Sequence, residues 1–277
     1  MFEQISIQKP LLEKAGLRAR RRLPFSGAGN FRDLGGYPAT DGGTVRWGVL
    51  YRSGALDKMT STDLKFLAAL NLERVIDFRA AHEKERAPDR LPPDADMRVV
   101  EIPILDASTK VWHEAREEMI RKLKDVDPAD YMTATNVELA TTFTPEMRRF
   151  IREVLSSNGR PLLFHCAAGK DRTGFGAALL LRLLGVPQDI VMQDYVLTNT
   201  YFLAAHTWRL FLVRLSRGER FASVIRGFMD ARPAYLSAAF DALEREHGSF
   251  EKYARNGLGL SAGDVERLKE IYLEQVT

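Results

Sequence analysis

The chain has 277 residues, 45% of them hydrophobic, and its 40 basic and 37 acidic residues leave a formal net charge of only +3. This length and apolar content suffice for a sizeable core and fit one decorated α/β domain, while the balanced charge argues against nucleic acid as the main partner. One cysteine excludes an intramolecular disulfide framework, and five scattered histidines without metal-ligand spacing argue against a metal hydrolase, so neither a metal nor another cofactor is expected.

The beginning of the chain predicts an arm ahead of one domain. Residues 18–22 read Arg-Ala-Arg-Arg-Arg, so we expect residues 1–24 to form a solvated arm and residues 25–277 to form the domain. The start lacks the basic region and apolar run of a signal peptide, and no stretch is long enough to span a bilayer. We therefore expect a cytoplasmic protein without a transmembrane segment, with export by a signal-free route left open.

Strands and one helix are expected in the first third of the domain. Glycine-punctuated short strands fit residues 30–52, an amphipathic helix fits residues 61–70, and a buried strand fits residues 74–79. The last of these places Asp77 and Arg79 at a strand end. Ligands of open α/β sheets bind outside the carboxyl ends of strands, so both residues are candidates for a site.

The middle of the chain is less sharply patterned. A strand is expected over residues 98–104, and a helix over residues 145–155 with Thr144 as its cap. Residues 106–143 between them are expected to be helical.

The most informative segment is residues 162–174, which read Leu-Leu-Phe-His-Cys-Ala-Ala-Gly-Lys-Asp-Arg-Thr-Gly. A strand-like stretch precedes Cys166, and a helix-like stretch follows Arg172. A loop of this length can turn its backbone N–H groups inward, where they create a positive electrostatic potential. The N-terminal end of the following helix adds to this potential, so the loop can hold a phosphate without a metal. The thiolate of Cys166 is the expected nucleophile, and Arg172 offers a planar fork to two phosphoryl oxygens. The residues expected to form the phosphate cradle are Ala167, Ala168, Gly169, Lys170, Asp171 and Arg172.

Two neighbours of the loop have supporting roles in this prediction. His165 is expected to hold the loop shape and the thiolate environment rather than to transfer a proton. Thr173 could donate its hydroxyl to the sulfur, or cap the helix, or do both. The plainer interpretation of Cys166 is a small buried hydrophobe, but the strand, glycine, arginine and helix all stand where a phosphate cradle requires them.

The last third of the chain is expected to be nearly all helical. Helices are predicted over residues 189–204, 233–247 and 261–275. The apolar stripe over residues 201–215 is expected to be core, although a lid over residues 200–230 that packs over a pocket would show the same pattern.

Four segments together carry a resemblance to a known family. They are residues 30–36 (Asn-Phe-Arg-Asp-Leu-Gly-Gly), 51–54 (Tyr-Arg-Ser-Gly), 76–79 (Ile-Asp-Phe-Arg) and 165–174. From about residue 25 to its end, the chain resembles the bacterial and fungal tyrosine-phosphatase-like family. The resemblance implies a central mixed sheet flanked by helices, a cysteinyl-phosphate intermediate without a metal, and a helical lid. It also implies activity on phosphotyrosine that often extends to phosphoserine, phosphothreonine and phosphoinositides.

The resemblance also suggests roles for single residues. Lys170 stands where three-phosphoinositide phosphatases carry a lysine that meets a second phosphate, and the alternative is a solvent-facing charge. Asp171 stands where myotubularins carry an aspartate, and the alternative is an ion pair with Arg172 or Arg79 that shapes the loop.

Further polar residues are expected around the loop. Arg32, Asp33 and Arg52 are expected to brace it from behind. Asp194 and Asn199 could position the hydrolytic water, or cap and cross-link helices.

The sequence thus predicts a cysteine-dependent phosphatase acting on phosphotyrosine, with a phosphoinositide phosphatase of the same mechanism as the alternative. A catalytically dead phosphate-binding module and a sulfurtransferase fit the loop less well. Asp171 is favoured over Asp77 as the proton donor, because it lies in the loop, whereas Asp77 stands next to Arg79 and an ion pair would keep it charged. The partners are a phosphorylated protein or a phosphoinositide, and the sequence says nothing about oligomeric state.

Overall fold

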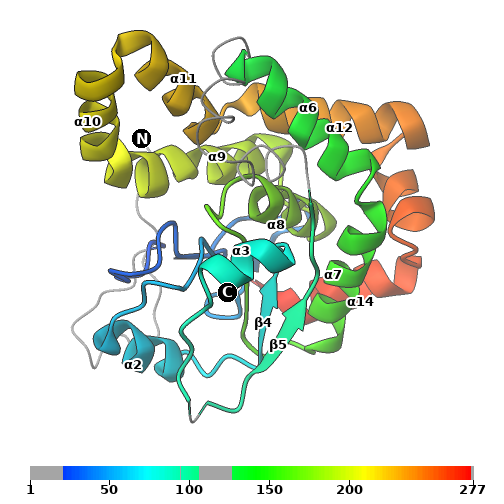
Figure 1. The fold of residues 1–277 in the computed structure, drawn as a ribbon. Helices are drawn as coiled ribbons and strands as arrows, with labels where there is room; N and C mark the ends of the chain where they lie inside the picture. The colour runs from blue at the N-terminus through cyan, green and yellow to red at the C-terminus, as the bar shows by residue number, and fades with distance from the viewer. Residues whose placement is uncertain (1–20, 94, 106–126, 276–277) are drawn as a thin grey trace.

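A five-stranded sheet forms the centre of the protein (Figure 1). The computed structural model describes residues 21–93, 95–105 and 127–275. The strand order is β1-β3-β6-β4-β5, in which β1 is antiparallel to β3 and the other neighbours are parallel. The sheet is therefore mixed, as expected, and β6 lies in its middle. The strands are β1 (Arg32–Asp33), β3 (Leu50–Ser53), β4 (Arg74–Asp77), β5 (Arg98–Glu101) and β6 (Leu162–His165).

The two faces of the sheet are covered by different parts of the chain. Leu163 and Val75 pack with Leu67 of α2 (Ser61–Ala69) and with the N-terminal segment on one face. Phe164 and Ile76 belong to the larger cluster on the other face, together with buried residues from most of the helices. Because successive strand residues point to opposite faces, the uninterrupted apolar run of β6 is buried on both sides.

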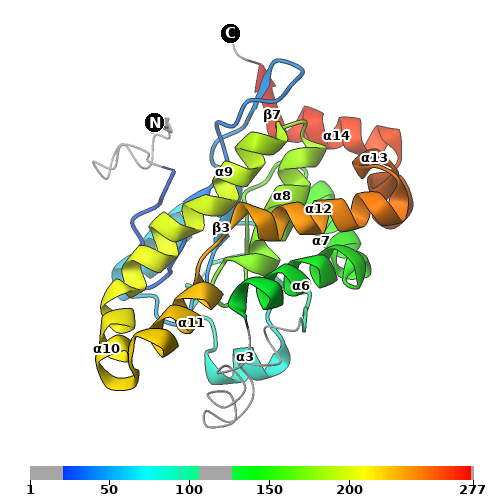
Figure 2. The same cartoon turned by 90° about the horizontal axis from the view of Figure 1, so that it is seen from above.

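The helices on the larger cluster form a layer. Figure 2 shows α6, α8, α9 and α12 running side by side. The short helix α3 follows β4 on the sheet's carboxyl side (Figure 1). The bounds are α3 (Ala81–Arg86), α6 (Pro128–Thr141), α7 (Thr144–Ser156), α8 (Asp171–Leu183), α9 (Gln188–Thr198), α12 (Pro233–His247), α13 (Phe250–Lys252) and α14 (Ala262–Tyr272).

The N-terminal end of α2 ties the start of the domain to the sheet. Thr60 caps the helix, and the Asp63 carboxylate accepts hydrogen bonds from the backbone N–H groups of Thr60, Ser26 and Gly27. Leu23, which we expected in the arm, is buried in the same region. Packing of the domain thus begins slightly earlier than predicted, while residues 18–20 of the arginine run lie outside the described residues.

Two predicted features near the ends of helices are wrong. The last helix ends at Tyr272, and Leu273–Gln275 form β7, which pairs with β2 (Gly43–Val45). The segment therefore leaves the helix because a partner strand is available to it. Thr144 does not cap α7, since its hydroxyl donates to the carbonyls of Ala140 and Thr141 in the preceding helix. The part of the 106–143 prediction that covers residues 106–126 lies outside the described residues.

A helical hairpin follows α9. The chain continues through a π-helix, η1 (Asn199–Leu203), and a short 3-10 helix, η2 (Ala204–His206), into α10 (Thr207–Arg217), and Gly218 turns it into α11 (Glu219–Met229). We call residues 200–230 the α10–α11 hairpin. The Asn199 amide closes its base, donating to the carbonyl of Ala231 at 2.8 Å and accepting from its N–H at 2.7 Å. Asn199 therefore cross-links helices, one of its two predicted roles.

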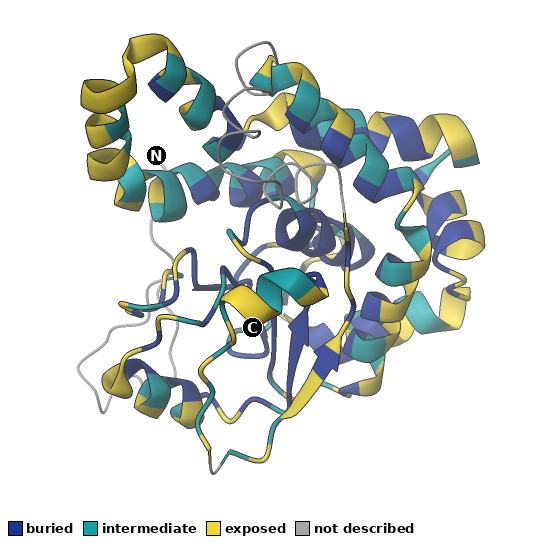
Figure 3. Cartoon of the chain, viewed as in Figure 1, coloured by how far each residue is buried: buried dark blue, intermediate teal, exposed yellow. Residues whose placement is uncertain are grey.

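The apolar stripe in this hairpin is not core. None of the residues of α10 is buried, and Figure 3 shows the helix largely in the exposed colour. The expectation that residues 201–215 pack into the core is wrong, because the stripe of α10 faces solvent. Among the described residues, the structure contains no helix long and apolar enough to cross a membrane.

Candidate active site

The Cys-x5-Arg loop lies at the carboxyl ends of three parallel strands. It connects β6 to α8, and His165 at the end of β6 pairs in register with Ser53 of β3 and Asp77 of β4. Gly169 has a φ of +66°, and a Cβ there would lie 2.4 Å from the carbonyl oxygen of Ser53. Only glycine fits this turn without a backbone shift, so the loop passes tightly against β3.

A pocket of about 480 Å³ is built on this loop. Cys166 lines it and is otherwise buried, with 2% of its surface exposed, so a substrate would reach the sulfur through the pocket. Besides the loop itself, charged and polar groups of α3 and apolar side chains from three other segments line the pocket. The lining includes His82, Glu83 and Arg86 on the α3 side, and Met132, Phe202, Phe228 and Met229 on the apolar side.

The Arg172 guanidinium is held by a carboxylate. Its two terminal nitrogens donate to the two oxygens of Glu83 at 2.7 and 2.9 Å. Burial works against the charged form of Glu83, but the hydrogen bonds and charge of Arg172 outweigh it and lower the pKa of this carboxyl. Glu83 thus fixes the plane of the guanidinium at the pocket wall. A guanidinium has a second fork, formed by Nε and one terminal nitrogen, which suits two phosphoryl oxygens.

Asp171 opens α8 and lines the pocket. One of its oxygens accepts from the Tyr195 hydroxyl and from the Asn136 amide, both at 3.3 Å. Burial and the neighbouring Asp171 charge raise the pKa of Tyr195 well above its ordinary value, so this phenol stays protonated and donates. The Asp171 carboxyl is therefore fixed in place by two donors while remaining at the pocket wall.

A buried ion network braces the loop from behind. Asp194 of α9 lies 3.0 Å from Arg32 and 2.6 Å from Arg52, and the Tyr37 hydroxyl donates to it. Arg52 in turn donates to the carbonyl of Gly169 at 2.8 Å. Burial and the nearby Arg32 charge lower the pKa of Arg52 to about 10, so it remains charged at neutral pH. This network ties strand, helix and loop together.

Two further residues of the segment 30–36 have different structural roles. Asn30 donates to the same carbonyl of Gly169 at 2.8 Å. Asp33 accepts from the backbone N–H groups of Gly35 and Gly48, so it shapes the neighbouring turns rather than the loop itself. Asp194 cross-links elements and, lying behind the loop, is not part of the pocket lining.

Sequence comparison decides the family. The profile of the tyrosine phosphatase family matches residues 23–274. The chain belongs to the tyrosine phosphatase family. A protein of Cupriavidus necator assigned to the tyrosine-protein phosphatases is 34% identical over 263 residues, which cover 94% of this chain and 91% of that protein. The triple specificity protein phosphatase PtpB of Mycobacterium tuberculosis is 29% identical over 282 residues, covering 92% of this chain and 99% of PtpB.

The similarity to solved structures is weaker than the similarity in sequence. The crystal structure of P. aeruginosa TpbA aligns with a TM-score of 0.34 and 17% identity, covering 73% of this chain and 96% of that chain. The fold of this tyrosine phosphatase therefore rests on its own sheet and on the sequence matches. The predicted family and the predicted phosphomonoesterase activity are confirmed.

Lys170 of the phosphatase loop is anchored to the α10–α11 hairpin. Its side chain is buried, and Nζ donates to the carbonyls of Phe228 at 2.6 Å and Asp230 at 3.0 Å, beside Asp171 at 3.5 Å. The solvent-facing alternative for Lys170 is therefore wrong. In this conformation the ammonium neutralises the carboxyl end of α11, where a cation is favourable.

We expect Lys170→Met to loosen the hairpin of this phosphatase. Hydrogen bonds from a charged donor contribute about 1.5–3 kcal/mol, so amide deuterium exchange in α11 should rise on the order of tenfold, while α12 should stay unchanged. The exposed Lys65 of α2 offers a matched control, because Lys65→Met removes the same charge away from the hairpin. Equal exchange in α11 of Lys170→Met and the parent would show that the ammonium does not hold the hairpin.

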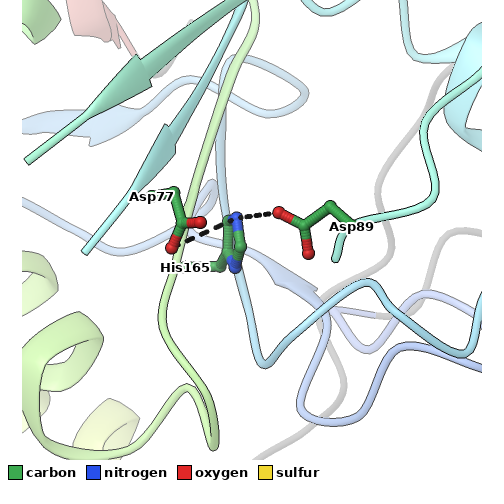
Figure 4. Close-up of side chains that lie close together, drawn as sticks. All are labelled: Asp77, Asp89 and His165. Carbon is green, nitrogen blue, oxygen red and sulfur yellow. Dashed lines mark ion pairs between the residues drawn. The ribbon is translucent and has the colours of Figure 1, made fainter. Parts of the chain in front are cut away.

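His165 and Asp77 belong to a second network beside the loop (Figure 4). His165 Nε2 lies 3.2 Å from Asp89 and 3.8 Å from Asp77. The Arg79 guanidinium contacts both carboxylates, at 2.8 Å for Asp77 and 2.7 Å for Asp89. Burial opposes the charge on Asp89, but His165 and Arg79 outweigh it and lower the pKa of Asp89.

The side chains of Asp77, Asp89 and His165 are close enough to one another to share a metal ion. A guanidinium already lies between the two carboxylates, so the cluster is typical of an ion network that supports the loop. Asp77 is buried in it and does not line the pocket, whereas Asp171 does.

Thr173 lies inside the first turn of α8. The cap of that helix is Lys170, so Thr173 does not cap it. Its hydroxyl oxygen is buried without a hydrogen-bond partner among the described residues. The remaining predicted role of Thr173, donation to the sulfur of Cys166, stays a prediction.

Several polar partners of the phosphatase site were not predicted from the sequence, among them Glu83, Asp89 and Tyr195. Glu83 stands in the charged run just after strand β4, and its position beyond a strand end is a signal that could have flagged it. Asp89 lies in a proline-flanked loop and Tyr195 on α9, and neither position has a local pattern that indicates its partner.

We expect Asp194→Asn to destabilise the phosphatase strongly. Removing one partner of a buried ion pair costs about 3–5 kcal/mol, because the other charges stay buried. Burial opposes the charge on Asp194, but Arg32 and Arg52 outweigh it and hold the pKa of this carboxyl well below its usual range.

The stabilisation by Asp194 is therefore complete above the unfolded-state pKa of about 4 and is lost as the pH falls toward the lower folded-state value. Urea unfolding should show a lower free energy of unfolding for Asp194→Asn than for the parent at pH 7, and a smaller difference between the two at pH 3. Asp241→Asn, at an exposed position in the middle of α12, is the control and should change the free energy of unfolding by less than about 0.5 kcal/mol. A difference in the free energy of unfolding that is the same at pH 7 and pH 3 would show that the charge of Asp194 does not stabilise the fold.

Proposed function

We propose that this phosphatase hydrolyses phosphotyrosine with Cys166 as the nucleophile. The observation that carries the proposal is the arrangement of Cys166, Arg172 and Asp171 around one pocket. The thiolate attacks phosphorus while the bond from phosphorus to the phenolic oxygen breaks. Arg172 and the loop amides hold the oxygens of the transferring group, where charge develops. Water then attacks the cysteinyl phosphate and releases inorganic phosphate, restoring the thiolate.

Asp171 is the proposed proton donor to the departing phenolate. It lines the pocket, and its two hydrogen-bond donors, Tyr195 and Asn136, fix the direction of the carboxyl. In the second half-reaction the same carboxylate takes the proton from the attacking water, so its protonation state is restored after each turnover.

The walls of the pocket support an aromatic substrate. Phe202, Phe228 and Met132 give it an apolar side on which a phenyl ring can pack. His82 and Arg86 of α3 also line the pocket, and such side chains suit acidic residues next to the phosphotyrosine of a peptide.

The phosphoinositide alternative depends on Lys170. The structure has this ammonium bound to two backbone carbonyls at the end of α11, so meeting a second phosphate would require the hairpin to move. Phosphotyrosine needs no such movement and is the favoured substrate.

The test compares phosphate release from three substrates at matched concentration: a phosphotyrosine peptide, a phosphoserine peptide and a short-chain phosphoinositide. The proposal expects the highest kcat/KM on the phosphotyrosine peptide. A higher value on the phosphoinositide, reduced by Lys170→Met more than the peptide value is, would establish the alternative in its place. The exposed-lysine variant Lys65→Met controls for the loss of charge.

A further inference from the structure

Among the residues that the structure describes, most of the exposed large apolar side chains lie on α10. Trp208 is 66% exposed, Phe211 44%, Leu212 47% and Leu215 68%. Their spacing of three, four and seven residues places them on one face of the helix, and the rings of Trp208 and Phe211 stack with centroids 5.4 Å apart. A contiguous exposed patch of large apolar side chains is typical of an interaction surface. We call these four residues the α10 stripe.

Arginines lie on both sides of the α10 stripe and farther along the hairpin. Residues 207–226 contain five arginines and one acidic residue, Glu219, which is paired with Arg214. With about 100° of rotation per residue in an α-helix, Arg209 and Arg214 fall on the two sides of the stripe. A Trp-, Phe- and Leu-bearing face framed by arginines is the composition of helices that lie in the interface of a membrane. The five arginines are Arg209, Arg214, Arg217, Arg220 and Arg226.

The hairpin is placed so that the α10 stripe can reach a flat surface. Figures 1 and 2 both show α10 at the periphery of the molecule, standing off the helical layer, and Figure 3 shows its outer side exposed. The other end of the same hairpin supplies Phe228 and Met229 to the pocket wall. A surface bound to α10 would therefore contact the same hairpin that contributes to the pocket wall.

We propose that α10 docks the protein onto an anionic membrane surface. The α10 stripe enters the boundary between head groups and acyl chains, and the flanking arginines contact lipid phosphates and carboxylates. Charge complementarity favours lipid over a second copy of the chain. A two-fold symmetric contact through the same helix would bring two sets of arginines together, and like charges oppose that contact. The proposal does not depend on which phosphate ester the site hydrolyses.

The test is co-sedimentation of the full chain with vesicles of phosphatidylcholine alone or with added phosphatidylserine. We expect binding to the anionic vesicles that weakens with salt, and little binding to the neutral ones. The double variants Leu212→Ser with Leu215→Ser, and Arg209→Glu with Arg214→Glu, should each lower the partition coefficient on the order of tenfold or more.

Matched controls lie elsewhere on the surface. Val99→Ser removes an exposed apolar side chain of β5 that is 47% exposed, and Arg255→Glu reverses an exposed charge of η3 (Tyr253–Gly257); both should bind as the parent does. Circular dichroism and hydrolysis of a small aryl phosphate show that all four variants are folded. A blue shift of tryptophan emission on binding that disappears in Trp208→Phe would place the α10 stripe in the lipid.

Three results would overturn the proposal. The first is equal binding to neutral and anionic vesicles, and the second is vesicle binding that neither double variant changes. The third is a parent protein that does not bind vesicles but forms a dimer in light scattering, which the double variant Leu212→Ser with Leu215→Ser dissociates. The last would identify the α10 stripe as a contact between copies of the chain.

Discussion

Cys166→Ser is expected to abolish turnover of a phosphotyrosine peptide, with a loss on the order of 10⁴-fold or more. The hydroxyl of serine is a far weaker nucleophile than a thiolate held at a phosphate cradle and a helix N-terminus. The cradle itself survives, because Arg172 keeps its partner Glu83, and Gly169 keeps its hydrogen bonds from Arg52 and Asn30. Binding of phosphate, measured by calorimetry, should therefore change little.

Cys166→Ala is the control for this result, since it also lacks a nucleophile and should lose as much activity. Turnover above background in either variant would show that another group attacks phosphorus.

Asp171→Asn is expected to slow hydrolysis of a phosphotyrosine peptide by about 10²–10⁴-fold, the usual contribution of general acid catalysis. An aryl phosphate with a strongly acidic phenol releases a stable phenolate that needs little protonation, so Asp171→Asn should hydrolyse this substrate nearly as fast as the parent does. The alkaline limb of the pH–rate profile should flatten, because the donor whose loss of a proton produces that limb is gone.

Asp77→Asn is the matched comparison. Asp77 holds Arg79 beside His165 and lies outside the pocket lining, so its loss should lower stability and affect both substrates alike. If Asp77→Asn instead shows the leaving-group dependence, and Asp171→Asn loses both substrates equally, the two roles are reversed.

The position of the phosphate loop could be predicted from sequence because its determinants are local. The apolar run before Cys166, Gly169 in the turn and the helix that begins at Asp171 are contiguous in the chain, and each follows from a period or a backbone requirement. The partners of the loop are not local. Glu83 and Tyr195 meet Arg172 and Asp171 only because the sheet and the helical layer bring α3 and α9 to the same edge.

The α10 helix shows the limit of pattern reading. Its apolar residues have the spacing of a buried face, and the 3.6 period alone does not tell which surface they meet. The structure leaves Trp208 and Leu215 facing solvent. The predicted end of the C-terminal helix was wrong for a related reason. Leu273–Gln275 form a strand because β2, far away in sequence, pairs with them.

The most direct test of Cys166 as the nucleophile is to trap the covalent intermediate. The parent enzyme is mixed with a phosphotyrosine peptide and quenched in acid within one turnover, and its proteolytic peptides are weighed by mass spectrometry. We expect the peptide containing Cys166 to gain the mass of one phosphoryl group, and fragmentation to place this group on sulfur. A phosphoryl group on His165, or turnover without any phosphorylated peptide at short times, would contradict this assignment.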